Sequence, residues 1–268
     1  MNTEISSKLS VILPVYNERD NLEYLIPQLV ELCLKHTTQF EVLVVDDDSS
    51  DNTDELIKKF QKKYVHLRYI KRLVNKSLPM SILEGIKKSK FQNVLWLDAD
   101  GSMDMSAVES LLHMFFKDQN KFIIGSRFVV GGGYKGQTSK KNNIFKIFRN
   151  IRNTEDSFVA IYLSILFNKF LESLLHSGVK DLTSGFIIGN KKHINKSVFT
   201  ESNYGEYFVY LVSDLVMRGQ EIIEVGYICK PRVFGSSKTS TNFMTLIRLG
   251  LPYIKAAIIC KRRITQKR

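Results

Sequence analysis

The chain has 268 residues, of which 44% are hydrophobic and 25% are charged. This composition is that of a globular protein and excludes a disordered or fibrous chain, and the length suits one large domain or a domain with an appendage. The 39 Lys and Arg residues outnumber the 27 Asp and Glu residues, and the resulting net charge of +12 indicates an anionic partner. That partner is nucleic acid, a phosphorylated small molecule or an anionic membrane surface.

The first half of the chain alternates between predicted strands and helices. Short apolar, β-branched runs predict strands at residues 9–15, 40–45, 66–70, 93–97 and 122–125. Apolar residues at helical spacing predict helices over 22–32, 56–60, 81–89 and 107–116, with Ser50 or Asp51 expected to cap the second one. Strands that alternate with helices predict an α/β fold, with a mostly parallel sheet that has helices on both faces.

Polar residues follow three of these strands. The sequence YNERDN follows the first strand, Asp46-Asp47-Asp48 the second and Asp98-Ala99-Asp100 the fourth. Ligands of open α/β sheets bind along the carboxyl ends of the strands, so we expect the functional site there. No GxGxxG follows the first strand and no GxxxxGK[ST] occurs, which argues against a dinucleotide fingerprint and a P-loop.

The second half of the chain is less regular. A polar, basic stretch at 134–153 predicts a loop, and 157–176 predicts a helix that is apolar over most of its circumference. The predicted elements that follow are a turn and strand at 181–189, a helix at 207–218, a strand at 221–228, a basic Gly/Ser loop at 231–240 and a helical tail from Phe243. We therefore expect a main domain over 1–240, containing the basic loop and apolar helix at 134–176, and an amphipathic basic tail over 241–268.

Cysteine spacing and the apolar segments limit the class of protein further. Cys33, Cys229 and Cys260 form neither a CxxC pair nor a metal-binding spacing, so we expect free thiols in a reducing compartment. The first residues lack the basic stretch and apolar core of a secretory signal. No run of about 20 uninterrupted apolar residues occurs, so no transmembrane helix is predicted.

The strand-end sequence Asp98-Ala99-Asp100 is the sharpest chemical signal in the chain. Two carboxylates one residue apart can present oxygens to one hard cation, and Mg²⁺ or Mn²⁺ is then held by these groups together with substrate phosphates. The competing interpretation is a pair of solvated turn acids or a helix N-cap. The position of the pair at a strand end, near a second acidic strand end, favours the metal site.

The acidic run at the end of the second strand is the next signal. An acid there can accept hydrogen bonds from a base N–H or a ribose hydroxyl. The alternative is an Asx-rich turn with a helix cap, and for Ser49, Ser50 and Thr53 we favour that alternative.

Six short motifs occur in one order along the chain: SVILPVYNERDNL, VVDDDSSDNT, LDADGS, GSRFVVGGG, DLTSGF and RVFGSSK. Together they resemble the inverting glycosyltransferases of the GT-A fold, and most of all the dolichol-phosphate mannose synthases and bacterial polyprenyl-phosphate sugar transferases. The match runs from about residue 9 to residue 238. The resemblance implies a Rossmann-like, mixed but mostly parallel sheet flanked by helices, with C-terminal amphipathic interface helices.

The resemblance also implies roles for particular residues. Those expected to bind the nucleotide-sugar donor are Pro14, Tyr16, Glu18, Val45, Asp47, Asp98, Ala99, Asp100, Arg127, Arg232 and Lys238. Mg²⁺ or Mn²⁺ is expected on Asp98, Asp100 and Ser102, and the catalytic set is Asp98, Asp100 and Arg127. A structural salt bridge is the alternative for Arg127, and a solvated basic loop is the alternative for Arg232 and Lys238.

The implied reaction is a metal-dependent, inverting transfer of a hexose to a polyprenyl or dolichyl phosphate, with mannose from GDP-mannose as the first choice. A phosphate acceptor is already anionic near pH 7 and does not strictly require a general base; Asp100 is the fallback base for a hydroxyl acceptor. The alternatives are a UDP-sugar donor with a cell-envelope glycan or glycolipid hydroxyl as acceptor, and a non-catalytic membrane-tethering scaffold. Departures from the family pattern at Ser77, Ile187 and Tyr210 concern the acceptor and the sugar more than the fold.

The basic and apolar segments predict where the protein works. The helix at 157–176, for which burial in the core is the alternative, and the tail at 243–260 fit an interfacial helix with flanking cations. We expect a protein that lies on the cytoplasmic face of a membrane without crossing it. Nucleic acid is disfavoured as the partner, because the cations are concentrated in one loop and the tail without interleaved aromatic residues.

Overall fold

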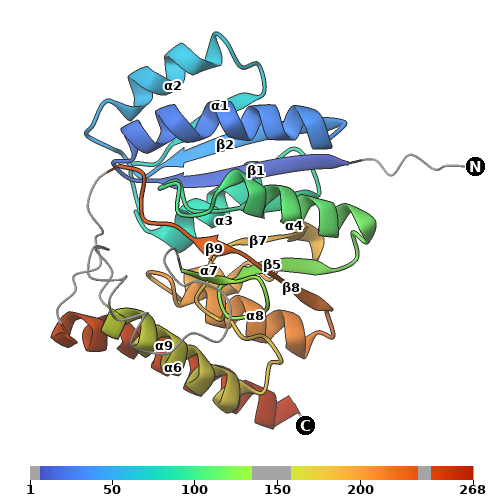
Figure 1. The fold of residues 1–268 in the computed structure, drawn as a ribbon, viewed down its shortest axis with the longest axis vertical. Helices are drawn as coiled ribbons and strands as arrows, with labels where there is room; N and C mark the ends of the chain where they lie inside the picture. The colour runs from blue at the N-terminus through green and yellow to red at the C-terminus, as the bar shows by residue number, and fades with distance from the viewer. Residues whose placement is uncertain (1–6, 135–157, 235–242, 268) are drawn as a thin grey trace, which may run out of the picture.

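The computed structural model describes residues 7–134, 158–234 and 243–267 (Figure 1). The strands are β1 (Lys8–Val15), β2 (Gln39–Asp46), β3 (Leu67–Lys71), β4 (Asn93–Trp96), β5 (Phe122–Ser126), β6 (Gly133–Tyr134), β7 (Ile187–Asn190), β8 (Ile222–Gly226) and β9 (Ile228–Cys229). The helices are α1 (Arg19–His36), α2 (Thr53–Gln61), α3 (Leu78–Lys88), α4 (Met105–Lys117), α6 (Phe158–Leu175), α7 (Ser197–Thr200), α8 (Tyr207–Met217) and α9 (Phe243–Lys267), with a 3₁₀ turn at Lys191–His193.

The main sheet is mixed and mostly parallel, as the sequence predicts. Its order in the described part of the chain is β3-β2-β1-β4-β7-β5-β8, and β7 runs antiparallel to both of its neighbours. The chain winds outward from β1 through β2 to β3 and then returns to place β4 on the other side of β1. This reversal between β1 and β4 is a topological switch point, where the loops at the strand ends diverge and leave room for a ligand.

Alternate side chains of each central strand pack on opposite faces of the sheet. In β1, Val11 and Leu13 belong to the core beneath α1 and α4, whereas Ile12 belongs to the core beneath α3. Residues of α6, α8 and α9 join the second core, so these helices lie together at the bottom of Figure 1. Central strands covered on both faces explain the near-continuous apolar runs in the sequence.

Local chemistry moves several element boundaries from their expected places. Helix α4 begins at Met105 because Asp104 is its N-cap, with Oδ1 accepting a hydrogen bond from the Ala107 N–H at 3.0 Å. The expected cap of α2 is confirmed only in part: the residue directly before the helix is Asn52, which lies in the left-handed region at φ 61° and makes no side-chain capping bond. Asp51 instead accepts hydrogen bonds from the backbone N–H groups of Thr53 and Arg19, at 3.2 and 2.9 Å.

The strand expected at 221–228 is divided in two. Strand β8 ends at Gly226, and β9 pairs in parallel with β6 in a separate two-stranded sheet. A Cβ atom at Gly226 would meet backbone atoms of Gly131 and Gly132 within 2.6 Å. The chain therefore passes at close range beneath the 130–132 turn and then leaves the main sheet.

Helix α9 covers the predicted helical tail, and one side of it is packed in the second core. Ala256, Ala257 and Cys260 are buried in the second core, and α9 contacts α6 and α8. None of the helices in the described ranges combines the length and apolarity that a membrane span requires. All three cysteines are free thiols. The domain division at residue 240 stays a prediction, because residues 235–242 lie outside the described ranges.

Candidate active site

A pocket of about 750 Å³ lies over the switch point, at the carboxyl ends of β1 and β4. Its size is within the range of small-molecule sites, about 300–1,000 Å³. The predicted site residues that line it are Pro14, Tyr16, Glu18, Asp47, Asp98, Ala99, Asp100, Ser102, Arg127 and Arg232. The first and last of them are more than 200 residues apart in the sequence, so the fold brings the predicted set together at one place.

Two predicted donor-binding residues are not among these lining residues. Val45 is fully buried in the core, because the alternation along β2 turns its side chain beneath α3 and away from the pocket. The donor-site prediction for the Val45 side chain is therefore corrected to a packing role. Lys238 lies outside the described residues.

Asp98 and Asp100 both line the pocket from the loop after β4. Asp100 Oδ1 accepts a hydrogen bond from the Ser102 N–H at 2.9 Å, whereas the Asp98 carboxylate accepts none from the described residues. Burial and then the neighbouring Asp100 raise the pKa of Asp98 to about 7. The capping role belongs to Asp104, which removes the N-cap interpretation of the Asp98/Asp100 pair.

This donor set fits a hard divalent cation that is shared with a substrate. The described residues contain no cluster of three or more His, Cys, Asp or Glu side chains that could enclose a metal. Two carboxylates on one pocket wall, with Ser102 beside them, match the way Mg²⁺ is held by one or two carboxylates, waters and substrate phosphates. A bound cation would also offset the repulsion that raises the pKa of Asp98.

Arg232 lies between two pocket carboxylates. Its Nε donates to Asp100 Oδ2 at 3.1 Å and its Nη2 donates to Glu18 Oε1 at 2.6 Å. Burial alone would lower the pKa of Arg232, but Asp100 and Glu18 raise it above its ordinary value. The predicted phosphate-binding cation therefore lines the pocket while paired with protein acids.

The segment that carries Arg232, Lys230–Phe234, crosses the pocket and is hereafter the crossing segment. Its backbone N–H groups at Lys230 and Val233 donate to the carbonyl groups of Ser102 and Asp100, at 2.9 and 3.2 Å. At its far end, the Phe234 N–H donates to Asn21 Oδ1 on α1 at 2.9 Å. The crossing segment thus joins the Asp98–Ser102 loop to the start of α1.

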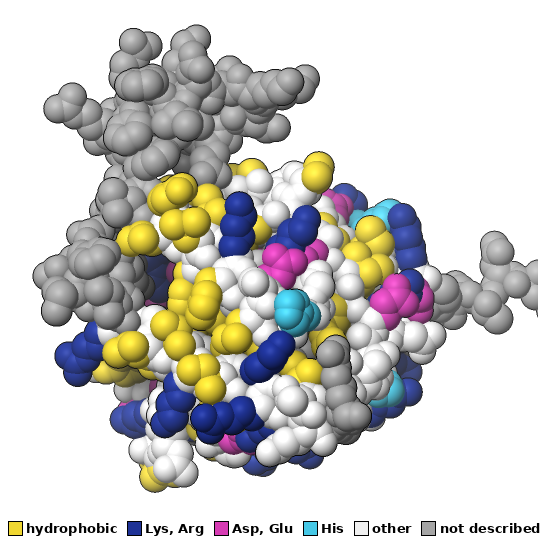
Figure 2. Space-filling model, turned by 90° about the horizontal axis from the view of Figure 1, so that it is seen from below, with side chains coloured by type: hydrophobic (Ala, Val, Ile, Leu, Met, Phe, Trp, Pro, Cys, Tyr) yellow, Lys and Arg dark blue, Asp and Glu magenta, His cyan; other side chains and the backbone are white. Residues whose placement is uncertain are grey.

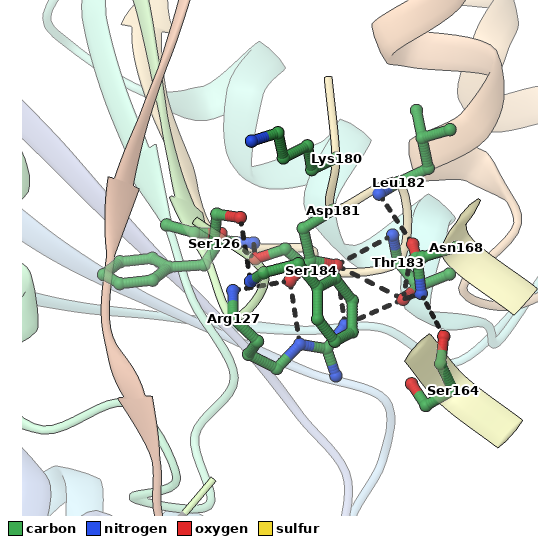
Figure 3. Close-up of polar contacts among 12 residues, drawn as sticks. Ser126, Arg127, Ser164, Asn168, Lys180, Asp181, Leu182, Thr183 and Ser184 are labelled. Atoms are coloured by element: carbon green, nitrogen blue, oxygen red, sulfur yellow. Dashed lines mark hydrogen bonds and ion pairs between the residues drawn. The ribbon is translucent and has the colours of Figure 1, made fainter. Parts of the chain in front are cut away.

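Arg127 is the centre of a second polar cluster (Figure 3). Its Nε and Nη2 donate to the two carboxylate oxygens of Asp181 at 2.8 and 2.7 Å, and Nη2 also donates to Thr183 Oγ1 at 2.7 Å. Its Nη1 donates to the Tyr134 hydroxyl at 3.2 Å. The salt bridge considered for Arg127 is therefore present, and the same side chain lines the pocket near Asp98.

The other end of the pocket is built around Asp47. Arg72 and Ser81 both donate to Asp47 Oδ1, the latter at 2.7 Å. Burial is the largest effect on Asp47 and raises its pKa despite these two donors. The N–H and the hydroxyl of Ser49 both donate to Asp46 Oδ1, at 3.0 and 2.5 Å. These bonds confirm the Asx-turn interpretation for Ser49.

Some lining residues were not among the predicted site residues. They are Val15, Lys76, Ser77, Leu78, Ser81, Asn203, Tyr204, Cys229, Lys230 and Pro231. Lys76 and Ser77 form the Lys-Ser pair at which the sequence departs from the family pattern, and that departure was their one signal. Asn203 and Tyr204 lie in a loop that Glu206 holds by accepting both of their backbone N–H groups, at 2.8 and 3.2 Å.

A mostly parallel sheet with a carboxylate pair beside its switch-point pocket defines a GT-A-type protein, and comparison with known proteins agrees. The family model described as Glycosyl transferase family 2 matches residues 10–197. The chain belongs to glycosyl transferase family 2.

Individual relatives resemble parts of this chain. Dolichol-phosphate mannosyltransferase of Pyrococcus furiosus is 34% identical over 125 residues, which are 47% of this chain and 34% of the relative. Poly(ribitol-phosphate) β-N-acetylglucosaminyltransferase TarP of Staphylococcus aureus is 33% identical over 129 residues, which are 47% of this chain and 38% of TarP. The matched stretch thus spans less than half the length of either relative.

Solved structures resemble the fold over nearly the whole chain. Glucosyl-3-phosphoglycerate synthase of Mycobacterium tuberculosis, in complex with Mn²⁺, UDP and phosphoglyceric acid, aligns with a TM-score of 0.63 and 13% identity. The alignment covers 96% of this chain and 81% of that protein. At this identity the similarity demonstrates a common GT-A fold.

Proposed function

We propose that this chain is a divalent-metal-dependent, inverting glycosyltransferase that moves a hexose from a nucleotide-sugar donor to a polyprenyl or dolichyl phosphate. Mannose from GDP-mannose is the proposed donor group. The observation that carries the proposal is that one pocket gathers ten of the predicted donor and metal residues, including Asp98 and Asp100. The names of the dolichol-phosphate mannosyltransferases among the relatives support the acceptor class.

The proposed roles follow from the charges around the pocket. Asp98 and Asp100, with Ser102, would hold Mg²⁺ or Mn²⁺, which supplies positive charge for the departing diphosphate. Arg232 and Lys238 are proposed to contact phosphate groups, and Arg127 adds fixed positive charge near Asp98. Pro14, Tyr16, Glu18 and Asp47 are proposed to contact the base and ribose.

The proposed transfer forms one bond and breaks one. An oxygen of the acceptor phosphate forms the new bond to the sugar C1, and the bond from C1 to the donor diphosphate breaks with inversion. The nucleoside diphosphate leaves with the electron pair. Because the attacking oxygen is already anionic near neutral pH, the step does not require a pocket side chain to remove a proton.

The face formed by α6 and α9 supports a membrane-bound acceptor (Figure 2). Large apolar side chains are exposed on both helices, namely Tyr162, Leu166 and Phe170 on α6 and Leu251 and Ile258 on α9. Exposed basic residues on the same helices are Lys169, Arg248, Lys255 and Arg262. We propose that this face lies on an anionic membrane surface, on its cytoplasmic side, with 1–240 as the catalytic domain and 241–268 as the associating tail.

A second candidate is transfer from a UDP-sugar to a hydroxyl of a cell-envelope glycan or glycolipid. The similarity to TarP, whose name gives a poly(ribitol-phosphate) acceptor and an N-acetylglucosaminyl group, favours it. The UDP in the structural neighbour points in the same direction. For such an acceptor, Asp100 is the proposed general base.

One assay separates these candidates. The purified chain, with Mn²⁺ or Mg²⁺, is incubated with GDP-mannose, UDP-glucose or UDP-N-acetylglucosamine, with and without a polyprenyl phosphate. We expect a mannosylated lipid phosphate to form only in the presence of GDP-mannose, the cation and the lipid. Transfer from a UDP-sugar to poly(ribitol phosphate), supplied as a hydroxyl acceptor in parallel reactions, would select the second candidate, and the absence of transfer under every condition, these included, would contradict both.

A further inference from the structure

Helix α6 has an unusual distribution of side chains. Tyr162, Leu166 and Phe170 recur every four residues along it and are 54%, 44% and 48% exposed. They form one apolar stripe on the outside of the molecule, hereafter the outer stripe. Asn168, in contrast, is 1% exposed and lies on the side of α6 that faces the sheet. The helix thus carries an exposed apolar stripe and, among buried apolar residues such as Leu171, one fully buried amide.

Asn168 connects α6 to the 181–184 turn (Figure 3). Its Oδ1 accepts the Leu182 N–H at 2.9 Å, and its Nδ2 donates to Thr183 Oγ1 at 3.0 Å. The same Nδ2 donates to the Ser164 carbonyl group within α6 at 3.0 Å, which fixes the direction of the amide. Because its amide is buried and bonded to these partners, Asn168 fixes the position of the turn relative to α6.

The 181–184 turn in its turn holds Arg127. Thr183 Oγ1 and both oxygens of Asp181 accept from the guanidinium, and Asp181 Oδ2 also accepts the Arg127 backbone N–H at 2.9 Å. From the opposite side, Glu224 on β8 accepts the N–H groups of Lys180 and Asp181, at 2.8 and 3.0 Å. Both ends of the turn are therefore tied to the sheet, through Glu224 and through the bond from the Ser184 hydroxyl to the Gly125 carbonyl group, and its middle is tied to α6 through Asn168.

We propose that Asn168 is a positioning residue for Arg127, and that contact of the outer stripe with a lipid bilayer is coupled through Asn168 to the pocket. The proposal rests on the proposed function for its membrane partner. A helix moves as a unit, so a bilayer that fixes the outer stripe also fixes Asn168 on the other side. The Asn168 bonds to Leu182 and Thr183 then set the turn that orients the Arg127 guanidinium.

The phenolic contact beside Asn168 supports this coupling. Tyr134, whose hydroxyl accepts from Arg127 Nη1, also lies 3.2 Å from Ser164 Oγ on α6. Two polar residues of α6, one turn apart, thus reach two different groups that contact the same guanidinium. No other described helix bonds to the ligands of Arg127 in this way.

The test compares Asn168→Leu with the wild-type chain. Leu has the same number and branching of side-chain heavy atoms as Asn but no polar atom, so it removes both bonds to the turn. The wild-type chain and the variant are assayed with a short, water-soluble polyprenyl phosphate, with and without vesicles of phosphatidylcholine and phosphatidylglycerol. We expect the vesicles to accelerate the wild type, and Asn168→Leu to bind vesicles normally but to lose about two- to thirtyfold in rate together with the vesicle effect.

The matched control is Asn93→Leu. Asn93 is also a buried amide with two bonds, to the Lys8 carbonyl group and Gln119 Oε1, but it lies at the amino end of the central strand β4, opposite the end that carries the pocket. We expect this variant to keep the vesicle effect. Asn168→Asp, which preserves the shape and the acceptor for Leu182, is expected to recover part of the loss and serves as the second variant if Asn168→Leu does not fold.

Two further measurements do not depend on the vesicle assay. In vesicle-free buffer, Asn168→Leu and Thr183→Val are expected to be non-additive, because both act on the same Arg127 contact; additive losses would overturn the positioning role. Hydrogen exchange of the peptide containing 181–184 is expected to slow when vesicles are added to wild type and to stay unchanged in Asn168→Leu.

The outcomes separate this inference from the proposed function. An Asn168→Leu variant that is accelerated by vesicles as strongly as wild type overturns the coupling. A wild-type chain that does not bind vesicles overturns the membrane partner and the coupling together. If no donor is used by the wild type, the proposed activity fails, and hydrogen exchange at 181–184 still decides whether Asn168 transmits the contact of α6.

Discussion

Arg232 lies where two carboxylates would otherwise repel each other. Its guanidinium bonds to Asp100 and Glu18, which come from the loop after β4 and the start of α1. The pair side chains are 21% exposed on Arg232 and 9–16% exposed on the acids, so solvent screens the interaction only in part. A cation bound at Asp100 would compete with Arg232 for the same carboxylate.

We therefore expect Arg232→Ala to have two opposite effects. Loss of a charge-assisted phosphate contact, worth roughly 1.5–3 kcal/mol, would lower kcat/KM by about tenfold to a few hundredfold. Removal of the competing guanidinium would tighten Mn²⁺ binding in the absence of donor, measured by electron paramagnetic resonance of free Mn²⁺. Lys230→Ala is the control, because Lys230 pairs with Asp104 and not with Asp100. A kcat/KM loss under twofold would support a solvated basic segment.

Asp100→Asn tests the metal site at the same position. The change preserves shape but removes one of two carboxylates, so we expect transfer to fall by about two orders of magnitude or more. Asn retains a side-chain oxygen that can accept the Ser102 N–H, so we expect the fold to persist, which circular dichroism checks. Wild type in excess EDTA is expected to lose transfer in the same assay. Full activity of the variant would contradict a metal role for Asp100.

At the scale of elements, the close packing of the loop after β4 against the crossing segment requires a glycine at position 101. Gly101 has a φ of 74°, and a Cβ there would lie 2.6 Å from Val233 Cγ2. We expect Gly101→Ala to lower the free energy of unfolding by about 1–3 kcal/mol through backbone strain, and to displace the crossing segment that carries Arg232. Thermal unfolding and kcat/KM measure the two effects.

Gly131→Ala is the matched control for that prediction. Gly131 also has a positive φ, 84°, but nothing lies within 4 Å of its missing Cβ. It should share the loss of stability from strain and lack the additional effect on kcat/KM. Equal losses of activity in both variants would contradict the contact between Gly101 and the crossing segment.

The sequence predicts those elements whose signal is local. Buried strands such as β1 and β4 are recognisable in the sequence as apolar runs that end in polar loops. The position of the site is predicted from the places where those runs end. The antiparallel direction of β7 has no such signal, because the alternation of side chains is the same in both directions. The pairing of Arg232 with Glu18, 214 positions away, likewise depends on the fold and not on spacing.

At the scale of the whole molecule, α9 is both a surface and part of the core. Ala256, Ala257 and Cys260 are buried in the second core, where α9 contacts α6 and α8, so deletion of residues 243–268 would expose that core. A truncated chain would confuse loss of membrane contact with loss of stability. Substitutions of exposed residues on α9 test the membrane face without this effect.

The last prediction uses two such substitutions. Leu251 and Ile258 are 56% and 43% exposed, whereas Lys255 and Arg262 are exposed cations on the same helix. Leu251→Ser with Ile258→Ser should weaken binding to anionic vesicles at every salt concentration, because burial of apolar area does not depend on salt. Lys255→Gln with Arg262→Gln should remove about 1 kcal/mol per charge at low ionic strength and have little effect at high ionic strength.

Vesicle sedimentation from low to high salt measures both pairs of variants. If α9 lies on the membrane, the wild type should bind less tightly in high salt but retain the apolar part of its affinity. Leu34→Ser is the control, since Leu34 is a 62% exposed apolar residue on α1, away from the α6–α9 face. If both double variants of α9 bind vesicles as tightly as the wild type, the outer stripe of α6 is the remaining candidate for the membrane contact. The net charge of +12 would then act at long range only, as attraction to an anionic surface that α9 does not touch.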